Sequence, residues 1–566
     1  MKRVIILVLI AAACIGVSWG TYQAVTSPPE PALSRYFPSG ALLYLQAKDF
    51  SSLLSRWDHS DENRLWLKSN NFEVFSRSRL FLRLKDANTE FSKAAGVPTD
   101  ANLLRQVAGK QSALAIFDIG KLEFLYITRL PSASSMQSSL WQTRSKFETR
   151  SAGGVTFFLR RDPESQREVA FAVAGDYLLL ATREDLLAGS LQLLANGNAH
   201  SIEAEPWWSQ PVTAAGTEGD LRMVLNLEKI VPSPYFRSYW VQQNITDMKQ
   251  YSAAISDLTL SEKEYREERV LLRKTAAIGD TLEGAGPVGV ANILRLVPAQ
   301  AGVYEAKANP APPDCLALLE TKILAPHLGP GTAEKFAPQV ELTSGETGSS
   351  TDLETRIDQP PVKAAVAENA EASLRDLLAK NPVSAMLQLE STEQVKDEVF
   401  IRMHSAVALL GQAEWDESAV RSALVDFVGP SLTAGDLGVE WQKNGAYLEL
   451  NGLWTLSVAV RGKYLLISDN PALLTSMLAN ADRKTALKPA VFVAGFDHQK
   501  EKGDFARLTG LLDKSAGGSA SGSTPNFFSD NIASLSSALA GLSSEKLVVR
   551  DAGNNVSQTV TYEWAR

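Results

Sequence analysis

The chain has 566 residues, of which 45% are apolar and 21% charged, and its formal net charge is -8. This composition excludes a disordered chain, and the length predicts several folded domains. The mild negative charge, without a long run of Lys and Arg, gives a nucleic-acid partner no electrostatic basis.

The N-terminus carries an export signal. Lys2 and Arg3 precede an uncharged, largely apolar stretch from Val4 to Val25, and these 22 residues would span roughly 33 Å as a helix, enough for a bilayer core. Residues 1–28 therefore predict a membrane anchor, with the basic end in the cytoplasm and the body outside it, in the periplasm. A signal peptide cleaved after Gly20 remains the alternative.

The segment 33–275 reads as a first α+β repeat. It opens with "FPSGALLYLQA", in which Pro38 precedes Tyr44 by six residues, and "DFSSLLSRW" follows as a helix capped by Asp49. Further along, "VAGDYLLLATREDLLAGSLQLL" predicts a tight turn at Gly175, a buried strand and an apolar helix.

The same landmarks return in the same order in the segment 293–566. "VPAQAGVYEA" again has a Pro six residues before a Tyr, Tyr304, and "VRGKYLLISDNPALLTSML" repeats the turn at Gly462, the strand and the helix. Each copy mixes successive strands with intervening helices, which favours α+β domains with mostly antiparallel sheets. The sequence thus predicts two tandem, internally duplicated domains.

Two segments look irregular. A Gly-rich linker is expected over 276–292 and an acidic, low-complexity surface insert over about 329–363. The linker contains "GAGPVG", which matches the dinucleotide fingerprint, but no strand ends immediately before it. It is interpreted as a flexible joint, and no cofactor is predicted.

Aromatic pairs supply the candidate contact residues. Trp207 and Trp208 in "EPWWSQP", and Tyr235, Tyr239 and Trp240 on one predicted helix face, form either part of a core or an exposed surface for a partner. The five histidines are scattered without metal-ligand spacing, so no metal or catalytic residue is predicted. A constellation of His404 with remote carboxylates stays open, and Cys315 is expected to be a buried, inert thiol.

The Pro-x5-Tyr strand and the "G-x-Y-L-L-(L/I)" strand with its Leu-Leu helix resemble a family of uncharacterised bacterial envelope proteins known only as a domain of unknown function. The resemblance implies an N-terminal anchor, a body outside the cytoplasm and no assigned catalytic residue. The second copy departs from it by its acidic insert and by lacking a match to the Trp57 to Trp66 region.

The sequence therefore favours a non-enzymatic, membrane-tethered envelope protein with a binding or scaffold role. The expected partners are the inner membrane, through the N-terminal helix, and an envelope protein, polymer or lipid. An extracytoplasmic hydrolase with a site between the repeats is the alternative.

Overall fold

The fold was analysed in a computed structural model. The structure describes residues 31–564 except for the internal segments 69–71, 73–75, 198–199, 235–247, 276–284, 328–367, 395–400, 433–439, 484–486 and 502–541.

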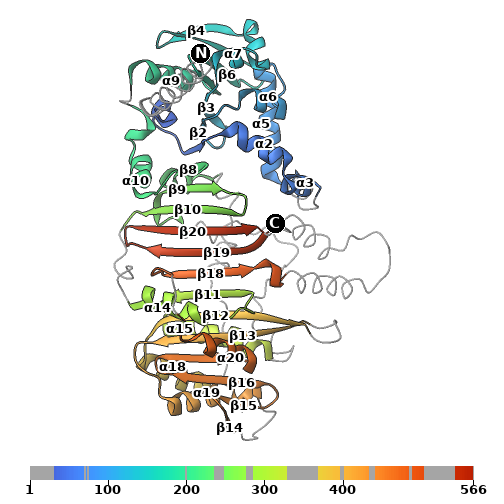
Figure 1. Cartoon of the computed structure of the whole chain (residues 1–566). Helices are drawn as coiled ribbons and strands as arrows, with labels where there is room; N and C mark the ends of the chain where they lie inside the picture. Colours follow the sequence, from blue (N-terminus) through green and yellow to red (C-terminus); the bar gives the residue numbers. More distant parts are fainter. Residues whose placement is uncertain are drawn as a thin grey trace, which may run out of the picture.

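One continuous sheet of 20 strands runs along the molecule, and every neighbouring pair in it is antiparallel (Figure 1). The first half contributes β1 (Leu43–Ala47), β2 (Ser112–Asp118), β3 (Glu123–Arg129), β4 (Glu148–Ala152), β5 (Val155–Arg161), β6 (Glu168–Ala174), β7 (Tyr177–Ala181), β8 (Leu221–Asn226), β9 (Tyr251–Leu260) and β10 (Glu264–Arg273). The second half contributes β11 (Val303–Ala308), β12 (Val383–Gln394), β13 (Ile401–Gly411), β14 (Trp441–Asn444), β15 (Tyr447–Asn451), β16 (Thr455–Arg461), β17 (Tyr464–Ser468), β18 (Phe492–Asp497), β19 (Leu542–Asp551) and β20 (Asn555–Trp564).

The strands of the two halves follow the same spatial order. In the first half this order is β4-β5-β6-β7-β3-β2-β1-β8-β9-β10. In the second it is β14-β15-β16-β17-β13-β12-β11-β18-β19-β20. The two last strands, β10 and β20, pair with each other and join the halves into one sheet.

The residue pairing also matches between the halves. Tyr44 in β1 lies opposite Ala115 and Val224, and Tyr304 in β11 lies opposite Leu389 and Gly495. The two Pro-Tyr strands therefore occupy the same place in the strand order.

The repeated phrase folds as its pattern predicts. Gly175 and Gly462 adopt φ values of 58° and 57° in the turns that lead into β7 and β17, a left-handed conformation that glycine adopts without a steric penalty. Leu179 and Leu466, at matching places in these strands, are 0% and 1% exposed. Their predicted burial is confirmed.

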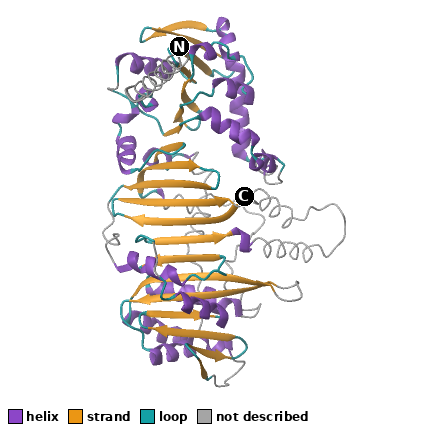
Figure 2. Ribbon diagram, in the orientation of Figure 1, coloured by secondary structure: helices purple, strands orange, loops and turns teal. Residues whose placement is uncertain are grey.

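Helices lie on both faces of the sheet (Figure 2). Those of the first half are α2 (Phe50–His59), α3 (Asp61–Leu67), α5 (Arg79–Ala95), α6 (Ala101–Val107), α7 (Ser132–Ser135), α8 (Ser139–Gln142), α9 (Glu184–Asn196), α10 (Pro206–Ala214) and α11 (Leu227–Ile230). Those of the second are α14 (Ala285–Ile293), α15 (Pro312–Leu319), α18 (Glu368–Lys380), α19 (Glu417–Leu432) and α20 (Pro471–Asn480). The Asp49 side chain caps α2 by accepting a hydrogen bond from the Ser52 amide, as predicted.

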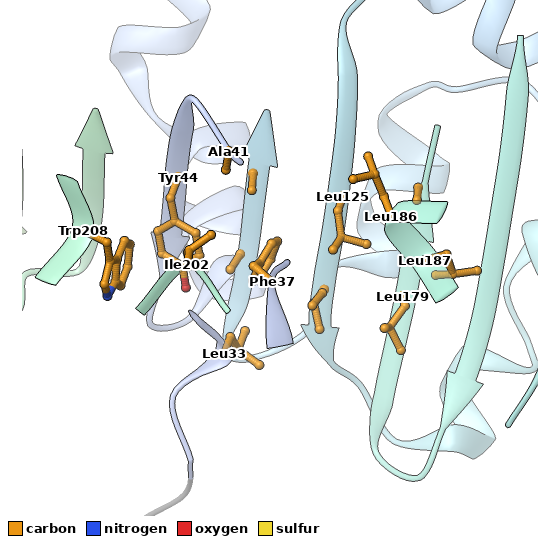
Figure 3. Packing of buried hydrophobic residues seen from close by; sticks show 14 of the residues in the cluster. Leu33, Phe37, Ala41, Tyr44, Leu125, Leu179, Leu186, Leu187, Ile202 and Trp208 are labelled. Carbon is orange, nitrogen blue, oxygen red and sulfur yellow. The ribbon is translucent and has the colours of Figure 1, made fainter. Parts of the chain in front are cut away.

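Each half has a buried cluster on either side of its sheet. In the first half, helix α9 packs its leucines against one face, where Figure 3 shows Leu186 and Leu187 beside Leu125 and Leu179. The opposite face carries a second cluster that includes Phe171. Cys315 is buried in the second half, and burial raises the pKa of its thiol to about 12, which agrees with the predicted inert role.

The predicted linker is wrong over its last part. Residues 285–292 belong to helix α14, in which Val290 and Ile293 are 0% exposed and pack in a core of the second half. A side chain at Gly289 would place its Cβ 3.1 Å from that of Ala385, so glycine lets the helix lie close to β12. Tertiary packing thus overrides the weak helix propensity of this Gly- and Pro-containing segment. Residues 276–284 and the predicted insert at 329–363 lie outside the described residues.

None of the helices within the described residues is long and apolar enough to cross a bilayer. The predicted anchor at residues 1–28 lies outside that part of the chain.

Candidate functional site: an apolar groove in the first half

A groove of about 1100 Å³ lies on the face of the first-half sheet that helices α5 and α6 cover incompletely. Its floor comes from seven neighbouring strands, from Leu180 in β7 to Glu267 in β10. Strands in a sheet are spaced about 4.8 Å apart, so this floor is roughly 29 Å across. The volume is slightly above the range of about 300–1000 Å³ that is common for small-molecule sites.

The groove wall is predominantly apolar. Leu45 and Leu114 lie opposite each other on β1 and β2, and Leu84 of α5 and Leu104 of α6 also line the groove. Leu45, Leu84 and Leu104 are 37%, 45% and 38% exposed. Large apolar side chains that share a concave, accessible surface are typical of a binding site for an apolar ligand.

Polar groups are found toward both ends of the groove, and they are paired. Near α5, the Arg167 guanidinium donates to the Glu90 carboxylate at 2.8 Å. At β9 and β10, Ser256 and Arg269 each donate to the Glu267 carboxylate at 2.6 Å. Burial acts to raise the pKa of Glu267, but these donors outweigh it and the pKa is lowered. The carboxylate therefore stays ionised and satisfied, and most of the side chains that line the groove between the two ends are apolar.

The second half has no such apolar strip at the matching positions. The opposed pair Leu45 and Leu114 corresponds by strand register to Glu305 and Gln388, and Gln388 donates to Glu305 at 2.9 Å. Glu390 on the same strand forms an ion pair with Lys322. Cys315, Leu316 and neighbouring leucines of α15 and α18 fill a packed core against the strands on this side of the sheet. At these matched positions, the second half therefore has no apolar groove wall.

The predicted aromatic contact residues are not in this groove. Trp207 and Trp208, at the start of α10, are 8% and 6% exposed. The Trp208 ring packs edge-on against that of Tyr44, 4.5 Å away between centroids, in the core on the other side of the sheet (Figure 3). Of the two interpretations of this pair, the structure agrees with the core, because both rings are covered by the fold. Tyr235, Tyr239 and Trp240 lie outside the described residues.

Sequence reasoning missed the groove, although a signal was present. In "ALLYLQA" and "SALAIF", apolar side chains lie on both faces of the strand. This pattern is typical of a strand that is covered on both sides. The sequence does not predict that the helices on one of these two faces, α5 and α6, cover the sheet incompletely.

A second pocket, of about 460 Å³, lies where the halves meet, at α10 and the β10 and β20 strands. Its lining is Ser209, Gln210, Thr213, Ala214, Leu272, Arg273, Asn554 and Asn555. This set includes neither a histidine nor a carboxylate pair, so it offers no general acid or base for the hydrolase alternative.

The fold does bring His404 to remote carboxylates. His404 Nε2 lies 2.8 Å from Glu393 and its Nδ1 lies 3.7 Å from Asp469, and His327 contacts the same Asp469 at 3.4 Å. Asp469 also accepts the Ser405 amide at 2.9 Å. The described residues form no cluster suited to a metal ion. We interpret this cluster as a structural ion-pair network.

This network predicts a pH-dependent stability. Asp469, and then Glu393, raise the pKa of His404, so the stabilisation is fully present below the unfolded value of about 6.5 and is lost as the pH rises through the higher folded value. We expect the free energy of unfolding measured in urea titrations to fall as the pH rises above about 6.5, through the raised pKa of His404. His404→Gln is expected to flatten that slope, and an unchanged slope would contradict the assignment.

Comparisons with known proteins give no relative that defines this chain. No family model and no curated protein matches it. Among solved structures, crystal form IV of TP0453 is similar at 13% identity and a TM-score of 0.24, over 43% of this chain and 80% of that chain. Crystal form I of TP0453 is similar at 14% identity and a TM-score of 0.25, over 44% and 81%. This similarity is too low to support an argument about the fold, which is described by the strand pairing of the chain itself.

Proposed function

We propose that the protein is a membrane-tethered, extracytoplasmic binding protein whose first half holds an extended hydrocarbon chain, such as the acyl chain of a lipid, in the apolar groove. One observation carries the proposal: the groove has a floor roughly 29 Å across and a predominantly apolar wall between its paired polar ends. Each methylene buried there would contribute about 0.8 kcal/mol.

The tether rests on the sequence. Lys2 and Arg3 before the uncharged stretch from Val4 to Val25 favour a retained anchor with the body in the periplasm. An envelope protein or polymer as partner has less support, because Trp207 and Trp208 are buried and the groove wall is predominantly apolar. Within the described residues, the pocket between the halves offers no general acid or base for the hydrolase alternative.

We also propose that the two halves are an internal duplication of one α+β domain, 33–275 and 293–566. The identical strand order and the matching pairs around Tyr44 and Tyr304 support it. In this view the second half kept the sheet and replaced the groove wall by the paired polar side chains of Glu305 and Gln388.

The second half supplies a sharp test of the groove. The double variant Leu45→Glu/Leu114→Gln introduces the pair that the second half has at the matching place, Glu305 and Gln388. The sheet accommodates that polar pair in the second half. We expect the detergent-solubilised full chain to bind a fluorescent fatty acid and the double variant to bind it at least about tenfold more weakly, because a chain would then cover polar groups.

Leu453→Glu is the matched control, because Leu453 is 74% exposed in the second half and far from the groove in the strand order. It is expected to bind the fatty acid like the unmodified chain. Equal affinity of the double variant and the control would show that the groove is not the site.

A further inference from the structure

Helix α2 carries an apolar stripe that the protein buries only in part. Phe50, Leu53, Leu54 and Trp57 recur at intervals of three and four residues and so share one side of the helix. No residue of α2 is buried, and Trp57 is 49% exposed. An amphipathic helix of a globular protein ordinarily packs such a stripe against its core.

The stripe begins at the groove. Phe50 lines the groove itself, and α2 continues from it toward α3, at the outer end of this group of helices (Figure 1). Leu67 in α3 and Leu82 in α5 are 53% and 48% exposed. Of the twelve large apolar side chains that are exposed within the described residues, seven belong to the groove or to α2, α3, α5 and α6. This concentration marks an interaction surface.

Resting on the proposed function, we infer that the stripe of α2, together with Leu67 and Leu82, is the surface by which the first half lies on one leaflet of a lipid bilayer, so that an acyl chain passes from the leaflet along Phe50 into the groove. The occupant of this surface is the bilayer itself.

Two observations favour a bilayer as the occupant. Trp57 stands at the far end of the stripe, and tryptophan is the residue that membrane interfaces favour most clearly, together with tyrosine. The uncharged stretch of the predicted anchor ends at Val25, eight residues before Leu33, a distance of at most about 29 Å when fully extended. The first half is therefore held within reach of the leaflet.

The test measures where Trp57 lies when the full chain is in a membrane. In a Cys14→Ser background, Trp57→Cys is labelled with an environment-sensitive fluorophore, and Cys315 remains because it is fully buried. The labelled chain is reconstituted into vesicles of phosphatidylcholine and phosphatidylglycerol, with and without brominated acyl chains. Ser55→Cys, exposed in the same helix outside the stripe, and Leu453→Cys, exposed in the second half, are the matched controls.

We expect a blue-shifted emission at position 57 and a quenching by brominated lipid at least about twofold stronger than at positions 55 and 453. Equal quenching at all three positions would overturn the inference. A blue shift without quenching would also overturn it, because the stripe would then be covered by protein, either across the groove or by a second molecule of this chain. Fatty-acid binding by the solubilised chain tests the groove separately, so the two proposals fail independently.

Discussion

Replacing Asp257 by valine is expected to lower the free energy of unfolding by about 3–5 kcal/mol, because the substitution leaves the Arg222 guanidinium charged and buried without its main partner. Arg222 Nε and Nη2 donate to the two carboxylate oxygens of Asp257 at 2.8 and 2.9 Å, and the Gly219 amide donates to the same carboxylate at 3.1 Å. Both residues are buried, at 9% and 4% exposure.

The second half again provides the control. By strand register, Val493 and Val548 occupy the places of Arg222 and Asp257, and both are buried. The double variant Arg222→Val/Asp257→Val is therefore expected to recover most of the loss, since a well-packed apolar pair commonly replaces a buried ion pair at little cost. Urea titration of the detergent-solubilised full chain measures the free energy of unfolding of the single and of the double variant. A single variant that loses less than about 1 kcal/mol would mean that water reaches Arg222.

The regular parts of the fold were predictable because they depend on local chemistry. The turns at Gly175 and Gly462 need a residue that accepts a positive φ, and the Asp49 cap uses a carboxylate to satisfy a free amide at the start of α2. The leucines at 179 and 466 lie in strands that are apolar on both faces, so their burial follows from the pattern.

The site was not predictable in the same way. Leu45 and Leu114 have the chemistry of core residues, and only the distance of α5 and α6 from the sheet leaves them accessible. Conversely, Trp207 and Trp208 resemble a contact surface in the sequence, but α10 turns both rings into the core. Whether an apolar side chain is covered depends on the placement of helices distant in the sequence, which periodicity does not specify.

The ion-pair network around Asp469 could not be predicted from the sequence either, because it joins residues that are distant in the chain. His327, His404 and Asp469 are separated by many residues, and the pairing of β13 with β17 brings the last two together. In the first half, Thr182 takes the place of Asp469 and accepts the Phe124 amide at 2.8 Å, just as Asp469 accepts the Ser405 amide. The contact to a backbone amide is common to both halves, whereas His327 and His404 contact this position only in the second.

Leu179→Ala and Leu466→Ala are expected to lower the free energy of unfolding by about 2–5 kcal/mol each, because each truncation removes a fully buried side chain and leaves a cavity that the sheet cannot close. Leu179 lies between Ala172 on β6 and Ile127 on β3, and Leu466 lies between Ala459 on β16 and Ala408 on β13. If the halves derive from one domain, the two costs agree within about 1 kcal/mol, whereas Leu453→Ala, at an exposed position, changes stability by less than about 0.5 kcal/mol. Urea titration of the three variants measures and compares these losses in the free energy of unfolding. A large cost at one leucine and none at the other would mean that the similar strand order hides two differently packed cores, and the duplication would have to be abandoned.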